Sequence, residues 1–117
     1  MPTLKGTLPA ELGYLTELKR INIENDELTG EIPSELGNLE KLITLRLMEQ
    51  SLTGQIPSTI WNLSSLQILN LRSNRLKGRI IGQPISNLKK LTFINLDKNN
   101  FVGKIPSEMG AMESLGE

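Results

Sequence analysis

Two residue types that much protein chemistry depends on are missing: the 117 residues include no cysteine and no histidine. Without histidine the chain lacks the usual general base and the commonest metal ligand. Without cysteine it has no thiolate nucleophile and no disulfide. Ser-His-Asp and Cys-His catalytic sets are therefore excluded. A bare carboxylate pair, as in glycosidases, remains as a route to catalysis, but nothing in the sequence positions one. We predict no enzyme, no catalytic residue, no metal site and no cofactor.

An excess of charge of one sign is also missing, since 13 Lys and Arg balance 13 Asp and Glu. Nucleic acids and anionic membranes need a clustered positive surface, so neither is a predicted partner. No apolar run approaches the roughly 20 residues that cross a bilayer, and the first residues lack the apolar stretch of a signal peptide. The lack of cysteine suits a reducing compartment, and equally an internal part of a secreted protein. We expect an extracellular or cell-surface location if the parent protein is secreted.

What the sequence does contain is a repeat. A series of leucines and isoleucines with a polar bend residue and a Gly-x-Ile segment begins at Leu15, Leu39, Leu63 and Leu88, with spacings of 24, 24 and 25 residues. Proline follows the Gly-x-Ile segment in every copy but the third. Self-similarity at this period indicates a solenoid whose coils share one elongated core. We treat residues 1–117 as one domain with repeats 15–38, 39–62, 63–87 and 88–111. Partial copies occupy residues 1–14 and 112–117.

Each repeat position has a physical reason. The alternation in Leu45-Arg46-Leu47 has the period of two residues typical of a half-buried strand. Copies of this strand in successive coils are expected to pair in parallel. The recurring glycines, such as Gly30 and Gly54, predict bends at which a residue without Cβ takes a positive φ.

Here a family resemblance becomes specific. The segments Leu28–Pro33 and Leu52–Pro57, read as Leu-Thr-Gly-x-Ile-Pro, resemble the plant-type leucine-rich repeat family, which includes receptor-kinase ectodomains and polygalacturonase-inhibiting proteins. The resemblance covers essentially the whole chain. It implies an α/β solenoid, a right-handed superhelix with a concave parallel sheet. It also implies a second small strand region near the Gly-x-Ile-Pro motif and short 3-10 or α turns on the convex side.

The sequence departs from the family pattern in three places. The family's bend asparagine is present as Asn74 and Asn99 but replaced by Asp26 and Gln50, so we expect weaker bend hydrogen bonding in the N-terminal half. Residues 80–85 carry one extra residue, which predicts a bulge at the second strand region, more often a tolerated insertion than a recognition feature. The chain starts and stops within a repeat without capping units. We therefore expect a fragment, a truncated product, or self-association through uncapped ends.

The candidate binding surface is the concave face. Polar and charged side chains flank the strand leucines in columns, and one column contains Asn22, Arg46, Asn70 and Asn95. Arginine and aromatic residues dominate interface energetics. We therefore predict that a ligand contacts Arg46, Asn70, Arg72, Asn95, Phe93, Met48 and Asp97. An ordinary solvated sheet face explains the same pattern equally well.

Two convex-side residues also stand out. Trp61 occupies the repeat position of Gly37 and is expected to pack against a neighbouring coil rather than to anchor a partner. Asn62-Leu63-Ser64 is the one Asn-x-Ser/Thr sequon, which makes Asn62 a candidate glycosylation site.

The sequence therefore favours a protein- or peptide-binding module of the receptor or inhibitor type, which recognises its ligand through the concave face. A carbohydrate- or ice-surface-binding repeat protein is the first alternative. Ice binding calls for a regular array of threonine or asparagine, which Arg46 interrupts. A structural spacer within a longer solenoid is the second.

Overall fold

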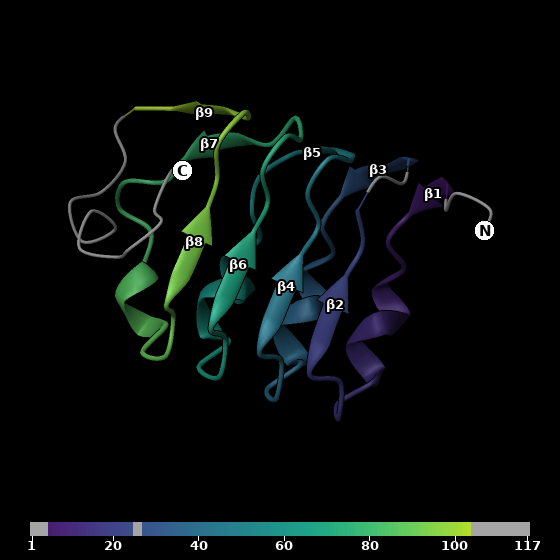
Figure 1. The fold of residues 1–117 in the computed structure, drawn as a ribbon, viewed down its shortest axis with the longest axis vertical. Helices are drawn as coiled ribbons and strands as arrows, with labels where there is room; N and C mark the ends of the chain where they lie inside the picture. The colour runs from purple at the N-terminus through teal and green to yellow at the C-terminus, as the bar shows by residue number, and fades with distance from the viewer. Residues whose placement is uncertain (1–4, 25–26, 104–117) are drawn as a thin grey trace.

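The computed structural model describes residues 5–24 and 27–103, which form successive coils of one solenoid (Figure 1). One strand from each coil joins a four-stranded parallel sheet, which we call the main sheet. Its strands, in spatial order, are β2(Arg20–Asn22), β4(Thr44–Arg46), β6(Ile68–Asn70) and β8(Phe93–Asn95). Since consecutive strands in the sheet come from consecutive coils, residues at the same repeat position lie side by side.

A second set of short strands follows the bends. The strands β1(Lys5–Thr7), β3(Glu27–Glu31) and β5(Ser51–Thr53) form one parallel sheet, and β7(Lys77–Arg79) pairs with β9(Asn100–Val102). Backbone hydrogen bonds still join the two parts, from Arg75 N–H to Leu52 O and from Lys77 N–H to Gly54 O, both 2.8 Å long. The predicted second strand region before the Ile-Pro segment is confirmed.

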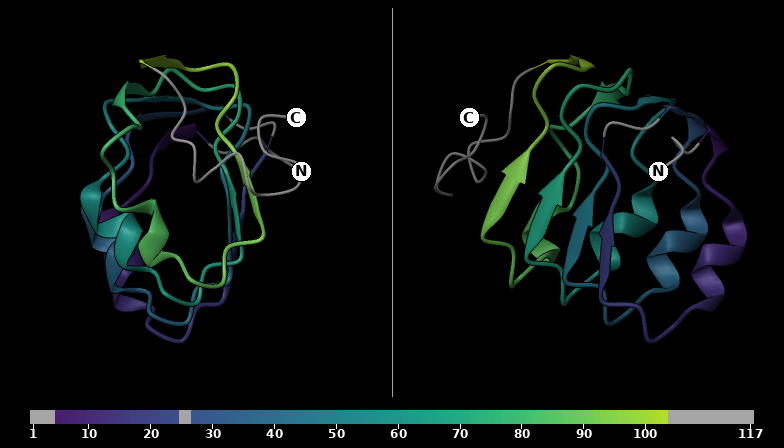
Figure 2. Two further views of the ribbon diagram at one scale, coloured as in Figure 1. Left: turned by 90° about the vertical axis from the view of Figure 1, so that its left-hand side faces the viewer. Right: turned by 45° about the vertical axis from the view of Figure 1, so that its right-hand side comes forward.

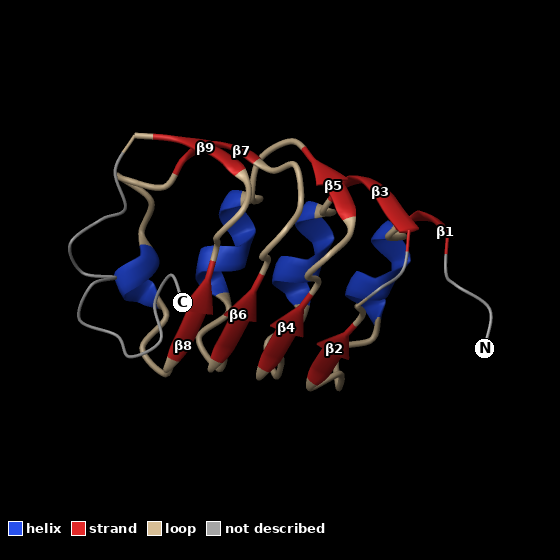
Figure 3. Ribbon diagram, turned by 45° about the horizontal axis from the view of Figure 1, so that its top comes forward, coloured by secondary structure: helices blue, strands red, loops and turns tan. Residues whose placement is uncertain are grey.

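Short 3-10 helices complete each coil on the side opposite the main sheet, as Figures 2 and 3 show. They are η1(Ala10–Tyr14), η2(Ser34–Asn38), η3(Ser58–Asn62) and η4(Ile85–Asn87). Each follows a proline, and before η1, η2 and η3 this proline is extended, with a φ of −60° to −78°. The predicted α/β solenoid, with parallel strands on one side and 3-10 turns on the other, is confirmed.

The core is a single column of aliphatic side chains between the main sheet and the helices. Leu45, Leu69 and Ile94 come from consecutive main-sheet strands and are fully buried, and Leu39 and Leu63 meet them from the helix side. Burial of a leucine or isoleucine side chain contributes about 1.5–3 kcal/mol. Because the repeat supplies these residues at fixed positions, the core continues through every described coil.

The repeated glycine before the Ile-Pro segment is needed for its positive φ, and at Gly54 a side chain of the preceding coil also lies close. Gly54 has a φ of +75°, which residues with a Cβ rarely adopt. A Cβ at Gly54 would also lie 2.7 Å from Cγ of Glu31, because the Glu31 side chain covers this glycine. The bend predicted from the sequence is confirmed, and the close approach of the preceding coil adds a second constraint.

Amide side chains tie each bend to the preceding coil. Asn74 Oδ1 accepts the Leu52 N–H at 3.1 Å, and its Nδ2 donates to Leu47 O at 2.8 Å and to Leu71 O at 3.1 Å. Asn99 makes the same set of bonds one coil later, accepting the Leu76 N–H.

The sequence predicted weaker hydrogen bonding at the bend of Gln50, and the structure shows that this prediction is wrong. Gln50 Oε1 accepts the Leu28 N–H at 3.1 Å, and its Nε2 donates to Ile23 O and Met48 O at 3.2 and 3.0 Å. The extra methylene is accommodated because Nε2 turns to the carbonyl two residues back instead of three. Asp26, the other departure, lies outside the described residues.

The extra residue in the third repeat forms a turn after β7, not a bulge within it. The strand pairs regularly with β9. Gly82, with a φ of +89°, lies in this turn, and Gln83 N–H donates to Ile80 O at 3.1 Å. The predicted bulge is therefore corrected: the insertion falls where the chain leaves the sheet, and there it disturbs no strand pairing.

Trp61 is fully buried, as the packing interpretation predicted. Its indole Nε1–H donates to Gln83 Oε1 at 3.1 Å. At the corresponding positions of earlier coils, a Cβ on Gly13 or Gly37 would lie 2.5 Å from Glu35 O or 2.4 Å from Thr59 Cβ. The next helix therefore packs directly on those glycines. After Trp61, the inserted turn and the shorter η4 make room for the indole.

Candidate interaction surface

The strand register places the predicted columns side by side on the main sheet. Asn22 pairs with Arg46, Arg46 with Asn70 and Asn70 with Asn95. The column before it contains Arg20, Thr44, Ile68 and Phe93. Side chains at these positions point away from the core leucines, because successive residues of a strand face opposite sides. The alignment of the columns follows directly from the repeat spacing.

Two of the predicted binding asparagines have structural roles. Asn70 Oδ1 accepts the Arg72 N–H at 3.2 Å, and Asn95 Oδ1 accepts the Asp97 N–H at 3.0 Å. Bonds of this kind, to the backbone two residues on, stabilise a turn. Asn70 is half-buried, whereas Asn95 is only 4% exposed. The prediction that Asn95 faces solvent is corrected: its side chain is buried beside the turn that it supports.

Arg46 lies near the centre of the main-sheet face and has an unusual environment. Its Nε is buried and has no hydrogen-bond partner, and its guanidinium forms no ion pair within the described residues. A depression of about 250 Å³ opens beside it, lined by Asn22, Ile23, Glu24, Arg46 and Met48. A buried donor without a partner costs about 1–3 kcal/mol. The Arg46 side chain as a whole is only half-buried and lines the depression, where it is open to an outside acceptor.

A second depression adjoins the first across Met48. Its volume is about 320 Å³, and it is lined by Met48, Glu49, Asn70, Arg72, Ser73, Asn95 and Lys98. The structure thus brings Met48, Asn70, Arg72 and Asn95 together around this depression. Phe93 and Asp97 line neither depression, although both are half-buried members of the same face.

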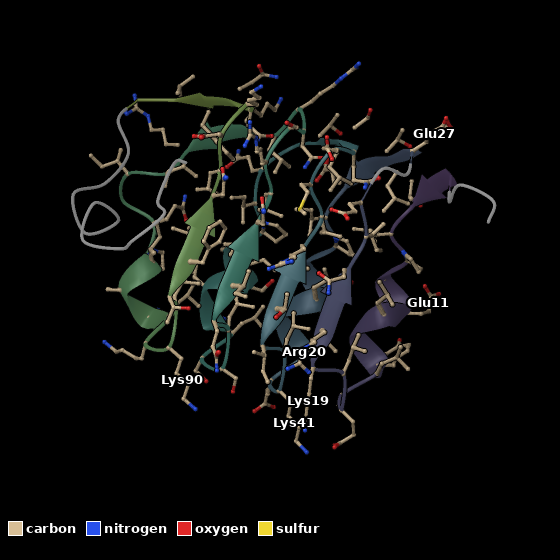
Figure 4. All side chains as sticks on the ribbon, in the orientation of Figure 1. Glu11, Lys19, Arg20, Glu27, Lys41 and Lys90 are labelled. Carbon is tan, nitrogen blue, oxygen red and sulfur yellow. The ribbon has the colours of Figure 1, made fainter. Side chains whose placement is uncertain are left out.

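The electrostatics of this face are mixed. Arg46 and Arg72 stand beside Glu24 and Glu49, so opposite charges alternate across the two depressions. At the edge where the main-sheet strands begin, Lys19, Lys41 and Lys90 project outward (Figure 4). Lys41 Nζ lies 2.7 Å from Glu17 Oε1. The hydrogen bond from Lys41, followed by its charge, lowers the pKa of Glu17 below its usual value.

Comparison with known proteins places this geometry in a family. The family model for the Leucine Rich Repeat matches residues 17–39, 65–88 and 90–112, which together exceed half of the chain. The matching solved structures include plant receptors, beginning with the ectodomain of the receptor kinase SOBIR1 from Arabidopsis thaliana. The chain belongs to the plant-type leucine-rich repeat family. No curated protein matched the sequence.

Three solved structures illustrate the range of this family. The SOBIR1 ectodomain is 32% identical with a TM-score of 0.88, and the match covers 97% of this chain and 62% of that one. The plant peptide hormone receptor RGFR1, in complex with RGF2, is 36% identical with a TM-score of 0.87, and the shares are 97% and 18%. A plant ice-binding protein is 34% identical with a TM-score of 0.83, and the shares are 92% and 34%. This leucine-rich repeat chain thus spans less than two thirds of the length of each.

The sequence prediction missed three residues of the second depression. Glu49, Ser73 and Lys98 have φ values of 62°, 60° and 58° and stand one residue before the bend amides. This left-handed conformation turns the chain out of the sheet and sets their side chains at its margin. The signal was present in the sequence, since position 49 recurs at 73 and 98 immediately before each bend amide.

In the part of the chain that the structure describes, no three His, Cys, Asp or Glu residues gather in a way that could hold a metal ion. None of the described helices is long and apolar enough to span a membrane. The main-sheet face, with its two depressions, is therefore the candidate interaction surface.

Proposed function

We propose that this leucine-rich repeat chain is a protein- or peptide-recognition module that binds its partner on the main-sheet face. The observation that carries the proposal is the half-buried Arg46, which forms no ion pair among the described residues and lies beside two depressions that share Met48. A peptide carbonyl or carboxylate supplies the acceptor that Arg46 lacks, and Met48 supplies an adaptable apolar contact. Arginine and methionine are both enriched at protein interfaces.

The relatives support this proposal. RGFR1 was solved in complex with RGF2, PEPR1 with AtPEP1, and HAESA with the peptide hormone IDA and the co-receptor SERK1. Those partners belong to those proteins. For this chain we infer only the class of partner, a protein or an extended peptide, together with the absence of enzymatic activity that missing histidine and cysteine support.

The experiment is a selection of random peptides displayed on phage against the immobilised chain, followed by titration of individual peptides. We expect Arg46→Glu and Arg72→Glu to weaken binding of selected peptides by tenfold or more. Arg75→Glu is the matched control, because Arg75 is exposed just before β7, in the second strand region. Peptides that bind all three variants as well as the unchanged chain would contradict the proposal.

A second candidate function rests on one comparison, the plant ice-binding protein. The structure gives it little support, because Arg46 interrupts the asparagine column and Asn95 is buried. Measurement of thermal hysteresis tests it directly, and freezing and melting points that coincide would remove it.

Self-association through the ends and a role as a structural spacer both stay predictions. Light scattering coupled to size-exclusion chromatography tests the first, since a monomer at all concentrations would exclude it. The spacer role requires that no peptide or protein be captured by the main-sheet face, so the phage selection tests it as well.

A further inference from the structure

We propose that Asn62 is an N-glycosylation site whose glycan lies on the 3-10-helix side of the solenoid and leaves the main-sheet face open. Asn62-Leu63-Ser64 has the Asn-x-Ser pattern, and Asn62 and Ser64 are both exposed. The inference requires that the chain enter the secretory route, as expected from the sequence for a secreted parent protein, and is otherwise independent of the proposed function. Mass measurement tests it without any ligand.

The local geometry presents the two polar residues of the sequon. Asn62 is the last residue of η3, and Leu63 after it is fully buried. Leu63 has φ and ψ of −80° and 76°, and Ser64 N–H donates to Asn62 O at 2.9 Å. These values describe an inverse γ-turn. Leu63 anchors the turn in the core, and its neighbours stay on the surface.

The side-chain amide of Asn62 is not used by the fold. It has no hydrogen-bond partner among the described residues. Asn70, Asn74 and Asn99, in contrast, all engage their side-chain amide groups in bonds to the backbone. Replacement of one Nδ2 hydrogen by a sugar therefore breaks no bond seen in this part of the chain.

Three other coils contain the same turn without the sequon. Thr16 N–H bonds to Tyr14 O, Glu40 N–H to Asn38 O and Lys89 N–H to Asn87 O, at 2.9–3.0 Å. The first turn has threonine but no asparagine, and the other two have asparagine but Glu40 or Lys89 in the third position. These turns are natural internal controls, because they have the same backbone hydrogen bond as the turn at Asn62 but each lacks one of the two residues that the sequon requires.

The surface beside Asn62 is hollow. A depression of about 610 Å³ is lined by Gly13, Tyr14, Thr16, Gly37, Asn38, Glu40 and Asn62. Gly13 and Gly37 contribute no side chain to its lining. Tyr14, which is 79% exposed, offers an aromatic surface across this hollow. The first sugars of a glycan on Asn62 fit along it.

The modification is a group transfer from a lipid-linked oligosaccharide diphosphate, catalysed by the host. The Asn62 Nδ2–H bond breaks, and Nδ2 forms a bond to the anomeric carbon of the first sugar. The bond from that carbon to the diphosphate oxygen breaks, and the lipid diphosphate leaves with its electron pair. The amide proton passes to a base, and no oxidant or reductant is needed.

The test is expression of the full 117-residue chain behind an added secretion signal in eukaryotic cells, with the intact mass measured before and after peptide N-glycosidase. We expect one glycan on the unchanged chain and none on Asn62→Gln or Ser64→Ala. Glu40→Ser creates the same sequon at Asn38 in the same turn, and we expect it to add a second glycan. A circular-dichroism melt of each variant verifies folding.

A secreted, folded chain with the bare polypeptide mass would overturn the proposal. So would a glycan that persists in Ser64→Ala. A glycosylated chain from which the phage selection yields no peptide dependent on Arg46 or Arg72 would overturn the proposed function alone. A peptide that binds the main-sheet face equally with and without the glycan is the expected result for a modification on the opposite side.

Discussion

Single amide side chains connect the bends of this solenoid to the coil before. Gln50, Asn74 and Asn99 each accept a backbone N–H and donate to carbonyl groups of both their own and the preceding coil. The groups that they satisfy lie at or near the core, where water is not an alternative partner. Loss of one amide therefore leaves several backbone groups unpaired at once.

The first prediction concerns Asn74. We expect Asn74→Ala to lower the free energy of unfolding by about 3 kcal/mol or more, because each orphaned buried group costs about 1–3 kcal/mol. Asn74→Gln should lose less than half as much, since Gln50 makes an equivalent set of bonds one coil earlier. Urea unfolding followed by circular dichroism measures both. Asn100→Ala, at an exposed position of β9, is the control.

If Asn74→Gln proves as damaging as Asn74→Ala, the tolerance seen at Gln50 belongs to that bend alone. The interpretation of the amide as an interchangeable bend element would then be wrong.

The second prediction concerns the left-handed residues. Glu49 has a φ of 62°, where a residue other than glycine, asparagine or aspartate is strained by roughly 1–2 kcal/mol. We expect Glu49→Asn to raise the free energy of unfolding by about 0.5–1 kcal/mol. Glu40→Asn is the matched control, because Glu40 is also exposed but has no positive φ. Equal effects at both positions would show that the gain comes from charge, not from backbone strain.

At the scale of single residues, the sequence predicted where the side chains lie better than it predicted what each side chain does. The columns of the face follow from the repeat spacing, so Arg46, Asn70 and Asn95 could be aligned in advance. The burial of Asn95 could not, because its hydrogen bond to the Asp97 N–H depends on the turn after β8. The success of Gln50 as a bend amide depends on which carbonyl its longer arm reaches, and the residue pattern does not contain that information.

At the scale of elements, two irregularities of the sequence compensate each other. Trp61 replaces a glycine on which the next helix would pack, and the next coil carries one extra residue just before its helix. The resulting turn brings Gln83 to the indole N–H and shortens η4 to three residues. Each irregularity alone would leave either a clash or a gap.

The third prediction is a double-mutant cycle on this contact. Trp61→Phe removes the indole N–H but keeps an aromatic ring, and Gln83→Ala removes its acceptor. We expect each to be destabilising and the double variant to be less so than the sum, with a coupling of about 0.5–3 kcal/mol. Thermal or urea unfolding of the four proteins measures it. Additive effects would show that the 3.1 Å contact contributes nothing of its own.

The elements themselves were predictable from the sequence to different degrees. The main-sheet strands and their order followed from the period, because residues 24 or 25 apart must lie side by side in a solenoid. The place of the insertion was not predictable, since a bulge in the strand and a turn after it have the same length. The chain forms a turn and not a bulge because Gly82 takes the positive φ that the turn requires.

At the scale of the whole molecule, each coil contacts its two neighbours and stability comes from these nearest-neighbour interfaces. Most of those contacts are apolar or backbone hydrogen bonds and do not titrate. Among the described residues, one exposed ion pair also links consecutive coils, since Glu17 and Lys41 hold the same position in adjacent repeats. Its stabilising contribution is present at neutral pH and is lost only in the acid range.

The fourth prediction gives the direction of that effect. Because Lys41 lowers the pKa of Glu17 in the folded chain, the pair stabilises the fold above the usual pKa of a glutamate. This contribution is lost as the pH falls through the lowered pKa. We expect Lys41→Met to return the pKa of Glu17 towards its usual value in an NMR titration. Both side chains are exposed, so the change in stability will be small.

The control is Lys90→Met, at the corresponding position of a later repeat. It should leave the titration of Glu17 unchanged. A Glu17 that titrates identically in all three proteins would mean that the hydrogen bond from Lys41 is not populated in solution.

The Trp61 contact also sets how such a chain could lengthen by duplication. A second copy of residues 15–38 placed after the first would make contacts that already occur in the structure. Gly37 of the first copy would face Glu35 of the second copy, as Gly13 faces Glu35 now. A second copy of residues 39–62 would set Thr59 and a five-residue η3 against Trp61, where the existing structure has Gln83 and the displaced η4. Growth by whole coils is thus open on the N-terminal side of this junction. On the other side it requires the tryptophan and the inserted residue to change together.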